Sequence, residues 1–378
     1  MDAWLCCFAR SPFTPAHKGG LKNVRPDEIA GQVIRAAIER SGIPSDKIDD
    51  MMVGCAYPEG EQGLNIGRIL TYLSGSPVSV PGMTTNRLCG SSMQVVHTAA
   101  GLIARGWGDL FICAGVESMS RVQRGGFNRS LHPGLEEKFP DAYISMGMTA
   151  ENVAVRFGIE RLRQEQFSLE SHQKADTANR QNRFSSNIVI IECGDDTISD
   201  DGCIRSQTTV EAMQKLKPAF VKNGTVTAAT SSPLTDGAVC LVIASDRAVG
   251  MYGLERIAKI HSAAVTGCQP SEMGLGPIEA TKLVLARAGL ELNDIGVIEL
   301  NEAFSSQSLA VIDELGFDLG KVNIDGGSLA IGHPLGASGA RIIGRSAEIM
   351  RRIGVKYALS TMCIGGGMGI ATILENPY

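Results

Sequence analysis

AAIERSGIPSDKIDDMMVGCAY at residues 36–57 and LVLARAGLELNDIGVIELNEAF at residues 283–304 follow one order of structural signals. Each stretch begins with a helical pattern, stops at a glycine, turns, and continues into an apolar strand. Gly42 matches Gly289, and Ile48 matches Ile295 at the same offset. The repeat predicts two related halves, each containing a helix that leads back to a buried strand.

A second pair of segments repeats at nearly the same offset. The helix start at residues 90–92 matches residues 336–338, and the apolar residues 110–115 match residues 357–362. Each half therefore alternates strands with helices, and helices that cross between buried strands join parallel neighbours. We predict an α/β protein with two duplicated halves and mainly parallel sheets.

The segment between the halves, residues 119–235, is polar and irregular, with an acidic run at residues 195–201. Helical patterns at residues 146–157 and 165–180 indicate that the segment is ordered. We predict an inserted loop domain that covers a substrate site. The expected domains are residues 1–118 with 236–254 for the N-terminal half, 119–235 for the insert, and 255–378 for the C-terminal half.

Composition and charge argue against several classes of protein. A net charge of −5 provides no basic field for nucleic acid. The ten cysteines include no CxxC pair, so we expect reduced thiols of a cytoplasmic protein and no metal site. The start carries no targeting pattern, and the apolar run at residues 238–244 is too short to span a bilayer, so no transmembrane segment is expected.

Cys89 lies in NRLCGSSM at residues 86–93, between a strand and an alanine-rich helix. A helix start directs backbone N–H groups at the sulfur, and this setting favours thiolate and a nucleophilic role. A buried structural cysteine is the alternative, because free cysteines often pack as small apolar residues. The strand, turn and helix favour the nucleophile.

Three further polar residues follow strand ends or glycine-rich turns. His333 lies in GHPLGASG at residues 332–339, at the turn equivalent to that of Cys89; a structural loop histidine is the alternative. Cys363 precedes the glycine run at residues 365–367, whose N–H groups could bind an oxyanion. This run matches no phosphate-binding motif. Asn301 follows a strand, and a helix cap is its alternative role.

Together these motifs resemble the thiolase family over nearly the whole chain. The matching segments are residues 87–97, 115–120, 146–153, 236–238, 301–307, 326–342 and 363–371. The resemblance implies the thiolase fold, a five-layer αβαβα core with an inserted loop domain. It also implies reversible, CoA-dependent thiolytic cleavage of 3-ketoacyl-CoA to acetyl-CoA and a shortened acyl-CoA in fatty-acid β-oxidation.

The resemblance gives each site residue a role. Cys89 would attack the keto carbon and carry the acyl group as a thioester, which a second CoA thiol removes. His333 would take the Cys89 proton, and Cys363 would exchange a proton with the acetyl carbanion or the incoming thiol. One oxyanion hole would use His333 with a water held by Asn301, and the other the N–H groups of Cys89 and Gly365.

CoA is the implied co-substrate, and no tightly bound cofactor is expected. Arg205 would meet the adenine end of CoA. A homodimer or homotetramer is expected, and membership in a β-oxidation multienzyme complex stays open. The positions that match the family's coenzyme pocket are Met146, Arg205, Ala219, Phe220, Ala228, Ser232, Leu234 and Met273.

Two positions bear on the subclass. Biosynthetic acetoacetyl-CoA thiolases usually carry His and Asn where this chain has Ser145 and Thr230, which favours the degradative branch. An acetoacetyl-CoA thiolase working in the condensing direction is the alternative. A ketoacyl synthase would normally have His or Asn in place of Cys363. A non-catalytic lipid- or CoA-binding module of thiolase shape would need neither both cysteines nor His333.

Overall fold

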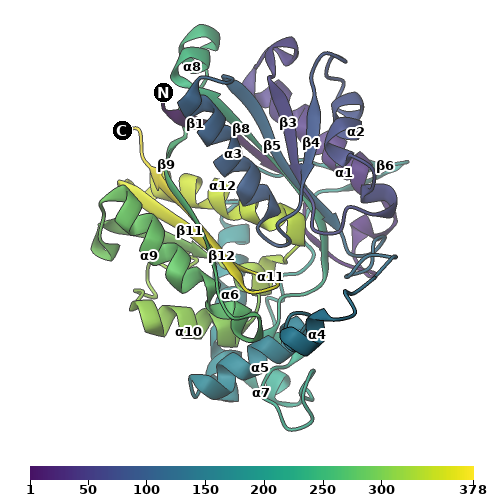
Figure 1. The fold of residues 1–378 in the computed structure, drawn as a ribbon, viewed down its shortest axis with the longest axis vertical. Coiled ribbons are helices and arrows are strands. Elements are labelled where there is room, and N and C mark those ends of the chain that lie inside the picture. Colours follow the sequence, from purple (N-terminus) through teal and green to yellow (C-terminus); the bar gives the residue numbers. More distant parts are fainter.

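The computed structural model describes residues 1–378 and joins the strands of both halves in one mixed sheet (Figure 1). The N-terminal half supplies β1 (Ala3–Arg10), β3 (Asp50–Gly54), β4 (Gly82–Thr85), β5 (Leu110–Ser118) and β8 (Thr235–Ser245). The C-terminal half supplies β9 (Ala258–Gly267), β10 (Ile295–Leu300), β11 (Tyr357–Ile364) and β12 (Met368–Glu375). The strand order is β10-β11-β12-β9-β1-β8-β5-β3-β4, and the short β2 (Thr14–Pro15) pairs with β8.

Within each half, all these strands but one point the same way. β3 runs parallel to β4 and β5, whereas β8 runs antiparallel to both β5 and β1. In the second half β10 runs parallel to β11, and β12 runs antiparallel to both β11 and β9. The halves meet at a seam between β1 and β9, where Trp4 pairs with Lys259 and Leu5 with Ala258. The predicted mixed and mainly parallel arrangement is confirmed.

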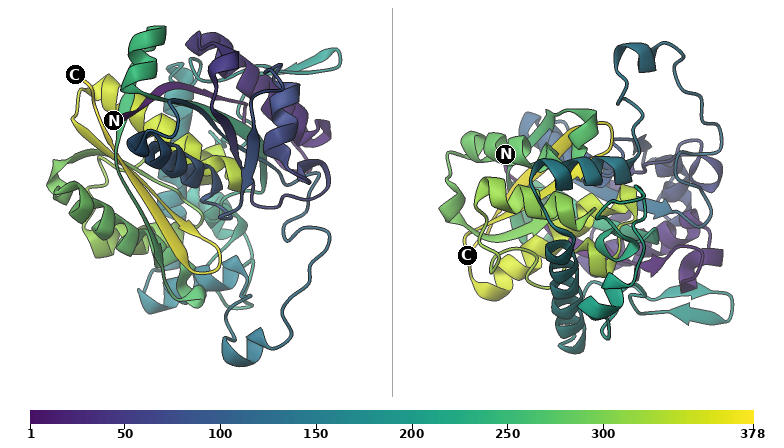
Figure 2. Two further views of the ribbon diagram at one scale, coloured as in Figure 1. Left: turned by 45° about the horizontal axis from the view of Figure 1, so that its top comes forward. Right: turned by 90° about the horizontal axis from the view of Figure 1, so that it is seen from below.

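Helices complete five layers (Figures 1 and 2). α3 (Ser91–Arg105) and α12 (Leu335–Ile353) pack together between the two halves of the sheet. α1 (Pro26–Ser41) and α2 (Ile66–Leu73) cover the N-terminal half, and α9 (Gly276–Ala288) and α10 (Ser305–Leu315) cover the C-terminal half. Clusters of 35, 31 and 20 buried hydrophobic residues fill the central and the two outer interfaces. This confirms the predicted αβαβα core.

The ends of equivalent helices show the duplication directly. α1 ends at Gly42 and α9 at Gly289, with φ of 67° and 65°. α3 ends at Gly106 and α12 at Gly354, with φ of 72° and 70°. Glycine adopts this left-handed conformation without the steric cost of a Cβ, so these residues stop the helices where the chain must turn. The predicted pairing of Gly42 with Gly289 is confirmed.

The insert packs mainly on the C-terminal half. α5 (Met146–Arg156) and α6 (Arg161–Arg180) contact α10, and α6 also contacts the short α11 (Ser328–Ile331). These two helices lie where helical patterns were expected. Figure 2 shows the loop that carries α4 (Leu135–Lys138) reaching out from the body of the molecule. The other elements of the insert are the hairpin β6 (Ile191–Cys193) and β7 (Asp196–Ile198), α7 (Val210–Gln214) and the 3-10 helix η4 (Ala228–Thr230).

The remaining elements are short connections. α8 (Asp246–Tyr252) links the two halves, and no helix of the chain has the length and apolar character needed to cross a membrane. The other 3-10 helices are η1 (Gly20–Asn23), η2 (Ser45–Lys47), η3 (Gly60–Gln62), η5 (Pro270–Leu275) and η6 (Leu292–Asp294).

Candidate active site

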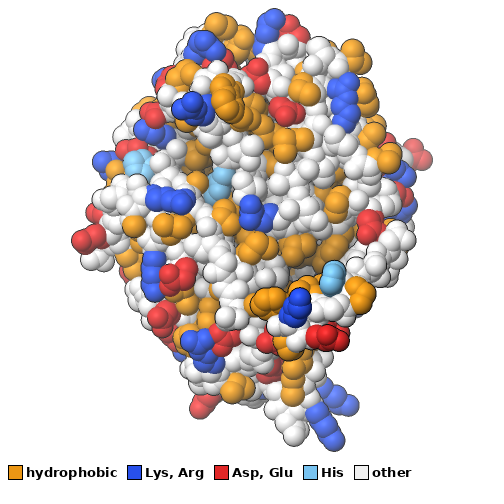
Figure 3. All heavy atoms as spheres, in the orientation of Figure 1, with side chains coloured by type: hydrophobic (Ala, Val, Ile, Leu, Met, Phe, Trp, Pro, Cys, Tyr) orange, Lys and Arg blue, Asp and Glu red, His pale blue; other side chains and the backbone are white.

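A cavity of about 760 Å³ lies where loops of both halves meet the insert. Cys89, His333, Cys363 and Gly365 line it, so the structure brings together four of the five residues expected to be catalytic. Most of the lining is hydrophobic, and Figure 3 shows hydrophobic side chains bordering a hollow on this face. The cavity is therefore suited to an acyl chain beside a small group of polar atoms.

The turn that carries Cys89 is held in a conformation that few side chains adopt. Leu88 has a φ of 45°, in the left-handed region. Asn86 Oδ1 accepts a hydrogen bond from the Leu88 N–H at 2.8 Å, and Ser91 Oγ donates to the Leu88 carbonyl at 2.6 Å. Such strain persists only where neighbouring groups enforce it. Here it turns the chain from β4 into α3 with Cys89 at the cavity wall.

The resting form of Cys89 is the thiol. Burial raises its pKa to about 11; the Gly365 N–H, which bonds the sulfur, lowers the pKa, and the Glu117 carboxylate raises it. The expectation that the helix start favours thiolate is therefore wrong for the resting protein, because lost hydration outweighs the stabilisation from N–H groups. To act as the expected nucleophile, Cys89 would need a base to remove its proton.

Glu117, in β5, is a buried residue that the sequence interpretation missed. Its Oε2 accepts from the N–H groups of Ala56 at 2.8 Å and Gly336 at 2.9 Å, and its Oε1 accepts from Gln62 Nε2 at 2.8 Å. A Cβ on Gly336 would lie 2.6 Å from the Val116 carbonyl oxygen, so glycine is required for this approach. Glu117 thus ties the N-terminal half to the loop of His333. Its place near a strand end, within the matching segment 115–120, was its signal in the sequence.

His333 is buried just before α12, and its hydrogen bonds define which ring nitrogen carries the proton. Nδ1 lies 2.5 Å from Ser338 Oγ, which lies 2.9 Å from the Pro334 carbonyl oxygen. A carbonyl can only accept, so Ser338 donates to Pro334 and His333 Nδ1–H donates to Ser338. Nε2 therefore keeps its lone pair. Burial, with the Arg341 charge, lowers the pKa of His333 to about 3, so the ring is neutral at neutral pH.

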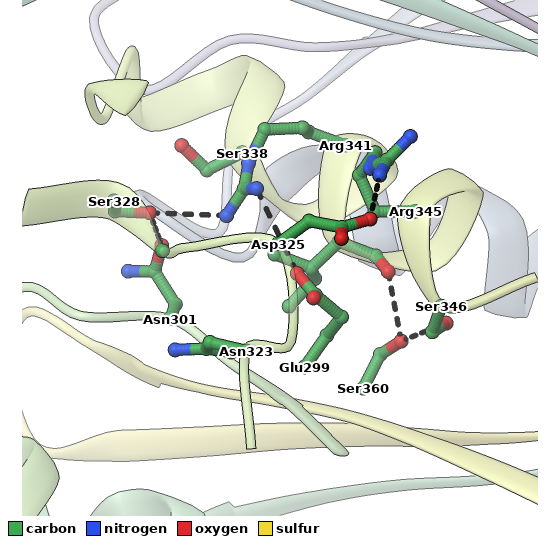
Figure 4. A network of polar contacts seen from close by, with 12 residues as sticks. Glu299, Asn301, Asn323, Asp325, Ser328, Ser338, Arg341, Arg345, Ser346 and Ser360 are labelled. Atoms are coloured by element: carbon green, nitrogen blue, oxygen red, sulfur yellow. Dashed lines mark hydrogen bonds and ion pairs between the residues drawn. The ribbon is translucent and has the colours of Figure 1, made fainter. Parts of the chain in front are cut away.

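Asn301 follows β10 and reaches the site through His333 rather than by lining the cavity. Its Nδ2 lies 3.4 Å from His333 Nε2, and its Oδ1 accepts from Ser328 Oγ at 2.6 Å. Figure 4 shows Ser328 between Asn301 and Arg341. Neither Ser328 nor Arg341 was expected at the site, because each acts through a partner distant in the sequence.

Cys363, in β11, lies in an apolar corner of the cavity. Burial raises the pKa of its thiol well above the ordinary value, and negative charge on Cys89 or Cys268 raises it further. The two thiols at the cavity therefore cannot both ionise easily, and their protonation is coupled. The hydrophobic neighbours of Cys363 are Met146, Ala150, Val226, Met273, Ala303 and Phe304.

The residues expected to hold CoA divide into three groups. Arg205 and Ala228 line a smaller neighbouring cavity of about 60 Å³, whose wall shares Ser231 and Pro233 with the large one. Ala219 borders neither cavity. Those that line the large cavity are Met146, Phe220, Ser232, Leu234 and Met273.

The cavity also has lining residues that the sequence interpretation did not single out. Tyr57 follows β3, and Arg124 and Arg129 come from the loop before α4. Only their position in or beside glycine-containing loops could have indicated them. No group of three or more His, Cys, Asp or Glu side chains is arranged to hold a metal ion.

Comparisons with known proteins match the chain over nearly its full length. The thiolase N-terminal domain matches residues 5–247, and the thiolase C-terminal domain matches residues 254–376. The 3-ketoacyl-CoA thiolase of Bacillus subtilis is 42% identical, with 99% of both chains covered. That of Pseudoalteromonas translucida is 44% identical, with 97% of this chain and 96% of the relative covered. The crystal structure of human mitochondrial 3-ketoacyl-CoA thiolase in complex with CoA has a TM-score of 0.92 and 35% identity, covering 99% of this chain and 98% of that one. The chain belongs to the thiolase family.

Proposed function

We propose that the chain cleaves 3-ketoacyl-CoA with CoA, yielding acetyl-CoA and an acyl-CoA shortened by two carbons, and that the reaction is reversible. The observation that carries this proposal is the meeting of Cys89, His333 and Cys363 at one largely apolar cavity. A nucleophile, a neutral base and a second proton carrier are the groups that the reaction requires. The 3-ketoacyl-CoA thiolase names of the relatives support the degradative assignment.

The first half-reaction breaks the bond between the α and β carbons of the substrate. Cys89 Sγ forms a bond to the keto carbon while His333 Nε2 takes the thiol proton. Because the thiol holds its proton tightly and the resting imidazole binds one weakly, the transfer accompanies C–S bond formation. The electron pair of the broken bond passes to the acetyl carbon, which takes a proton from Cys363 and leaves as acetyl-CoA.

The second half-reaction regenerates the resting thiols. The incoming CoA thiol gives its proton to the Cys363 thiolate and attacks the acyl thioester on Cys89. Cys89 leaves and recovers its proton from the His333 imidazolium. Cys89 recovers its own proton, and the CoA thiol proton replaces the one that Cys363 gave to the acetyl carbon. Both residues end as thiols, so the cycle needs no metal or redox partner.

Two sets of donors are placed to stabilise the oxyanions that form on the way. Once protonated, His333 carries a donor at Nε2, beside the Asn301 amide. The N–H groups of Cys89 and Gly365 both lower the pKa of the Cys89 thiol, so they favour negative charge at this point of the site. Loss of one such donor typically lowers the rate about 10²- to 10³-fold.

For CoA, we propose an approach along the wall that Phe220 and Leu234 of the insert form with Met273. The relative bound to CoA supports a coenzyme site in this fold. Arg205, on the adjoining small cavity, would meet the adenine end. CoA acts as a co-substrate, and the opposite wall of the large cavity would take the acyl chain.

Peptide mass spectrometry tests the proposed function. Incubation with 3-ketoacyl-CoA in the absence of free CoA should leave an acyl group on Cys89. An acyl group on another residue, or none, would contradict the mechanism. A kinetic series from short to long ketoacyl-CoA separates the degradative enzyme, which accepts many chain lengths, from an acetoacetyl-CoA thiolase confined to the shortest.

We further propose a location and a subunit number for the enzyme. The ten cysteines form no disulfide, a pattern common in reducing compartments, which supports a cytoplasmic location. We also propose a homodimer or homotetramer, as is common among thiolases. Light scattering of the purified chain would establish the subunit number.

A further inference from the structure

We propose that Ser328 and Arg341 are positioning residues that fix the direction in which the Asn301 amide faces His333. Neither residue lines the cavity, and both act through hydrogen bonds. The proposal rests on the proposed function for its effect on turnover. The hydrogen-bond chain itself is a property of the resting protein.

The three side chains form a continuous buried chain (Figure 4). An Arg341 terminal nitrogen donates to Ser328 Oγ at 3.1 Å, and Ser328 Oγ donates to Asn301 Oδ1 at 2.6 Å. They come from different elements, because Arg341 belongs to α12, Ser328 begins α11, and Asn301 follows β10. The fold therefore brings three separate segments together at the Asn301 amide.

Arg341 fixes the direction of donation along this series of hydrogen bonds. A guanidinium has donors and no acceptor, so the Ser328 oxygen must accept from it. The single Ser328 proton is then free to point at Asn301, and the amide atom that meets it must be the oxygen. Asn301 consequently presents its N–H₂ group to His333 Nε2.

A reversed Asn301 amide would lose hydrogen bonds at both ends. Its nitrogen would face Ser328 and leave the hydroxyl proton without its acceptor. Its oxygen would face His333 Nε2, whose lone pair is maintained by the Nδ1–H bond to Ser338. Unpaired buried polar groups are costly, so the chain excludes the reversed amide.

Arg341 is buried, and its side chain makes one hydrogen bond, the one to Ser328. Glu299 is the nearby buried carboxylate, with its Oε2 at 3.7 Å from Arg341 Nη1, beyond hydrogen-bond distance. Arg341 Nε and Nη1 have no hydrogen-bond partner within the chain. Ser328 is therefore the one side chain to which Arg341 donates. Burial raises the pKa of Glu299 to about 7, and this carboxyl does not compete for that donor.

The fixed direction of the Asn301 amide matters both for oxyanion stabilisation and for proton transfer at the site. An Asn301 amide fixed in this direction provides a donor for a developing oxyanion, directly or through water. The amide offers only donors to His333, so Nε2 keeps its lone pair. Because the contact with the amide is long, at 3.4 Å, Nε2 can exchange it for the Cys89 proton. The direction of hydrogen bonding is thus set on both sides of His333, by Arg341 on one side and by the Pro334 carbonyl on the other. Asn301 is kept as the donor, and His333 Nε2 is kept as the base.

The test is Ser328→Ala, which removes the middle of the chain. We expect kcat to fall about 10- to 100-fold while KM for CoA changes less than about two-fold, because positioning and not binding is lost. Ser328→Thr retains the hydroxyl and should recover most of the rate. Should Ser328→Ala fail to fold, Ser328→Cys, with a weak donor of similar size, should show the same loss.

Ser346→Ala is the matched control. Ser346 is a buried serine of α12 that bonds Ser360 at 2.8 Å and touches neither Asn301 nor His333. Its removal should leave kcat within about two-fold of the wild type. An equal fall in Ser346→Ala and Ser328→Ala, or an unchanged kcat in Ser328→Ala, would overturn the proposal.

A double-mutant comparison shows whether Ser328 acts through the amide. Ser328→Ala should cost nothing further in an Asn301→Ala background, whereas an independent structural role would give additive losses. Additive losses would therefore refute the inference.

Alkylation of Cys89 by iodoacetamide needs no substrate and separates the two proposals. It should be slower in Ser328→Ala, because a reversed amide would bind the Nε2–H form of His333 and remove the base. Absent cleavage by the wild type would contradict the proposed function alone. Equal alkylation of wild type and Ser328→Ala would contradict the positioning role alone.

Discussion

Replacing Glu117 with glutamine should weaken the fold and activate the nucleophile at the same time. Each carboxylate oxygen accepts from two donors: Oε2 from the N–H groups of Ala56 and Gly336, and Oε1 from the Tyr57 N–H and Gln62 Nε2. Whichever way the glutamine amide is oriented, its nitrogen faces two donors and leaves both without an acceptor.

The magnitude follows from those two lost bonds. Hydrogen bonds to a charged group contribute about 1.5–3 kcal/mol each, which gives a loss of about 3–6 kcal/mol. Burial raises the pKa of Glu117, so removal of the charge relieves part of this cost. We therefore expect the free energy of unfolding to fall by about 3 kcal/mol, measured by urea titration.

The effect on Cys89 should have the opposite sign. The Glu117 charge contributes to the raised pKa of Cys89, so its removal lowers that pKa and increases the thiolate fraction. Iodoacetamide should then alkylate Cys89 faster in the folded variant than in the wild type, at a fixed pH near 8. Slower or equal alkylation in the folded variant would refute the electrostatic reasoning.

Glu151→Gln is the control for that experiment. Glu151 is also a buried carboxylate, and it accepts from the N–H groups of Thr225 at 2.9 Å and Val226 at 3.0 Å. Its charge is not among the influences on the pKa of Cys89. The control variant should lose stability without a change in Cys89 alkylation.

Three further outcomes are expected. Cys363→Ala should still allow acyl labelling of Cys89 yet abolish turnover, because the acetyl carbanion loses its proton source; near-normal turnover would remove Cys363 from the mechanism. Gly336→Ala should destabilise the fold by about 1–3 kcal/mol by overpacking, whereas Gly101→Ala, which has open space around it inside α3, should stabilise it by about 0.5–1 kcal/mol; equal urea midpoints would contradict this. Burial lowers the pKa of His97 from 6.5 to about 3. Between these two pH values the unfolded state binds a proton that the folded state does not, so the free energy of unfolding decreases as the pH is lowered. Relative to His97→Gln, the wild type should lose about 1.4 kcal/mol per pH unit below about 6.5, and parallel urea-unfolding profiles would contradict it.

The architecture was predictable because its signals are local. Gly42 and Gly289 stop equivalent helices, and this stop needs only a residue that adopts a positive φ. The motifs around Cys89 and His333 begin equivalent helices, so recognition of the repeat placed both residues at corresponding turns. Local spacing also indicated α5 and α6 within an otherwise irregular insert.

The electrostatics of the site could not be read from local spacing. A helix start predicted thiolate at Cys89, but its pKa depends on burial by segments from both halves and on Glu117. No local pattern indicates a role for Ser328, which the fold places between Arg341 and Asn301. These properties arise from packing between segments distant in the sequence, which local sequence patterns do not indicate.

The coenzyme positions show the same limit in another way. Arg205 and Ala228 lie on the small cavity, whereas Phe220 and Leu234 line the large one. The insert has little regular structure between α6 and β8, so no periodicity indicates which side chains face which cavity. The resemblance to the thiolase family indicated these residues, and the folded structure shows which of the two cavities each one lines.

The seam between β1 and β9 divides the chemistry as well as the sheet. Cys89 belongs to one side, whereas His333 and Cys363 belong to the other, and the link between them is the short connection from α8 to β9. A chain cut there would carry its nucleophile and its proton carriers on separate polypeptides. Neither fragment could complete a turnover, so recovered activity would serve as a direct readout of fragment complementation. The ancestral duplication has thus left a natural design for a split enzyme.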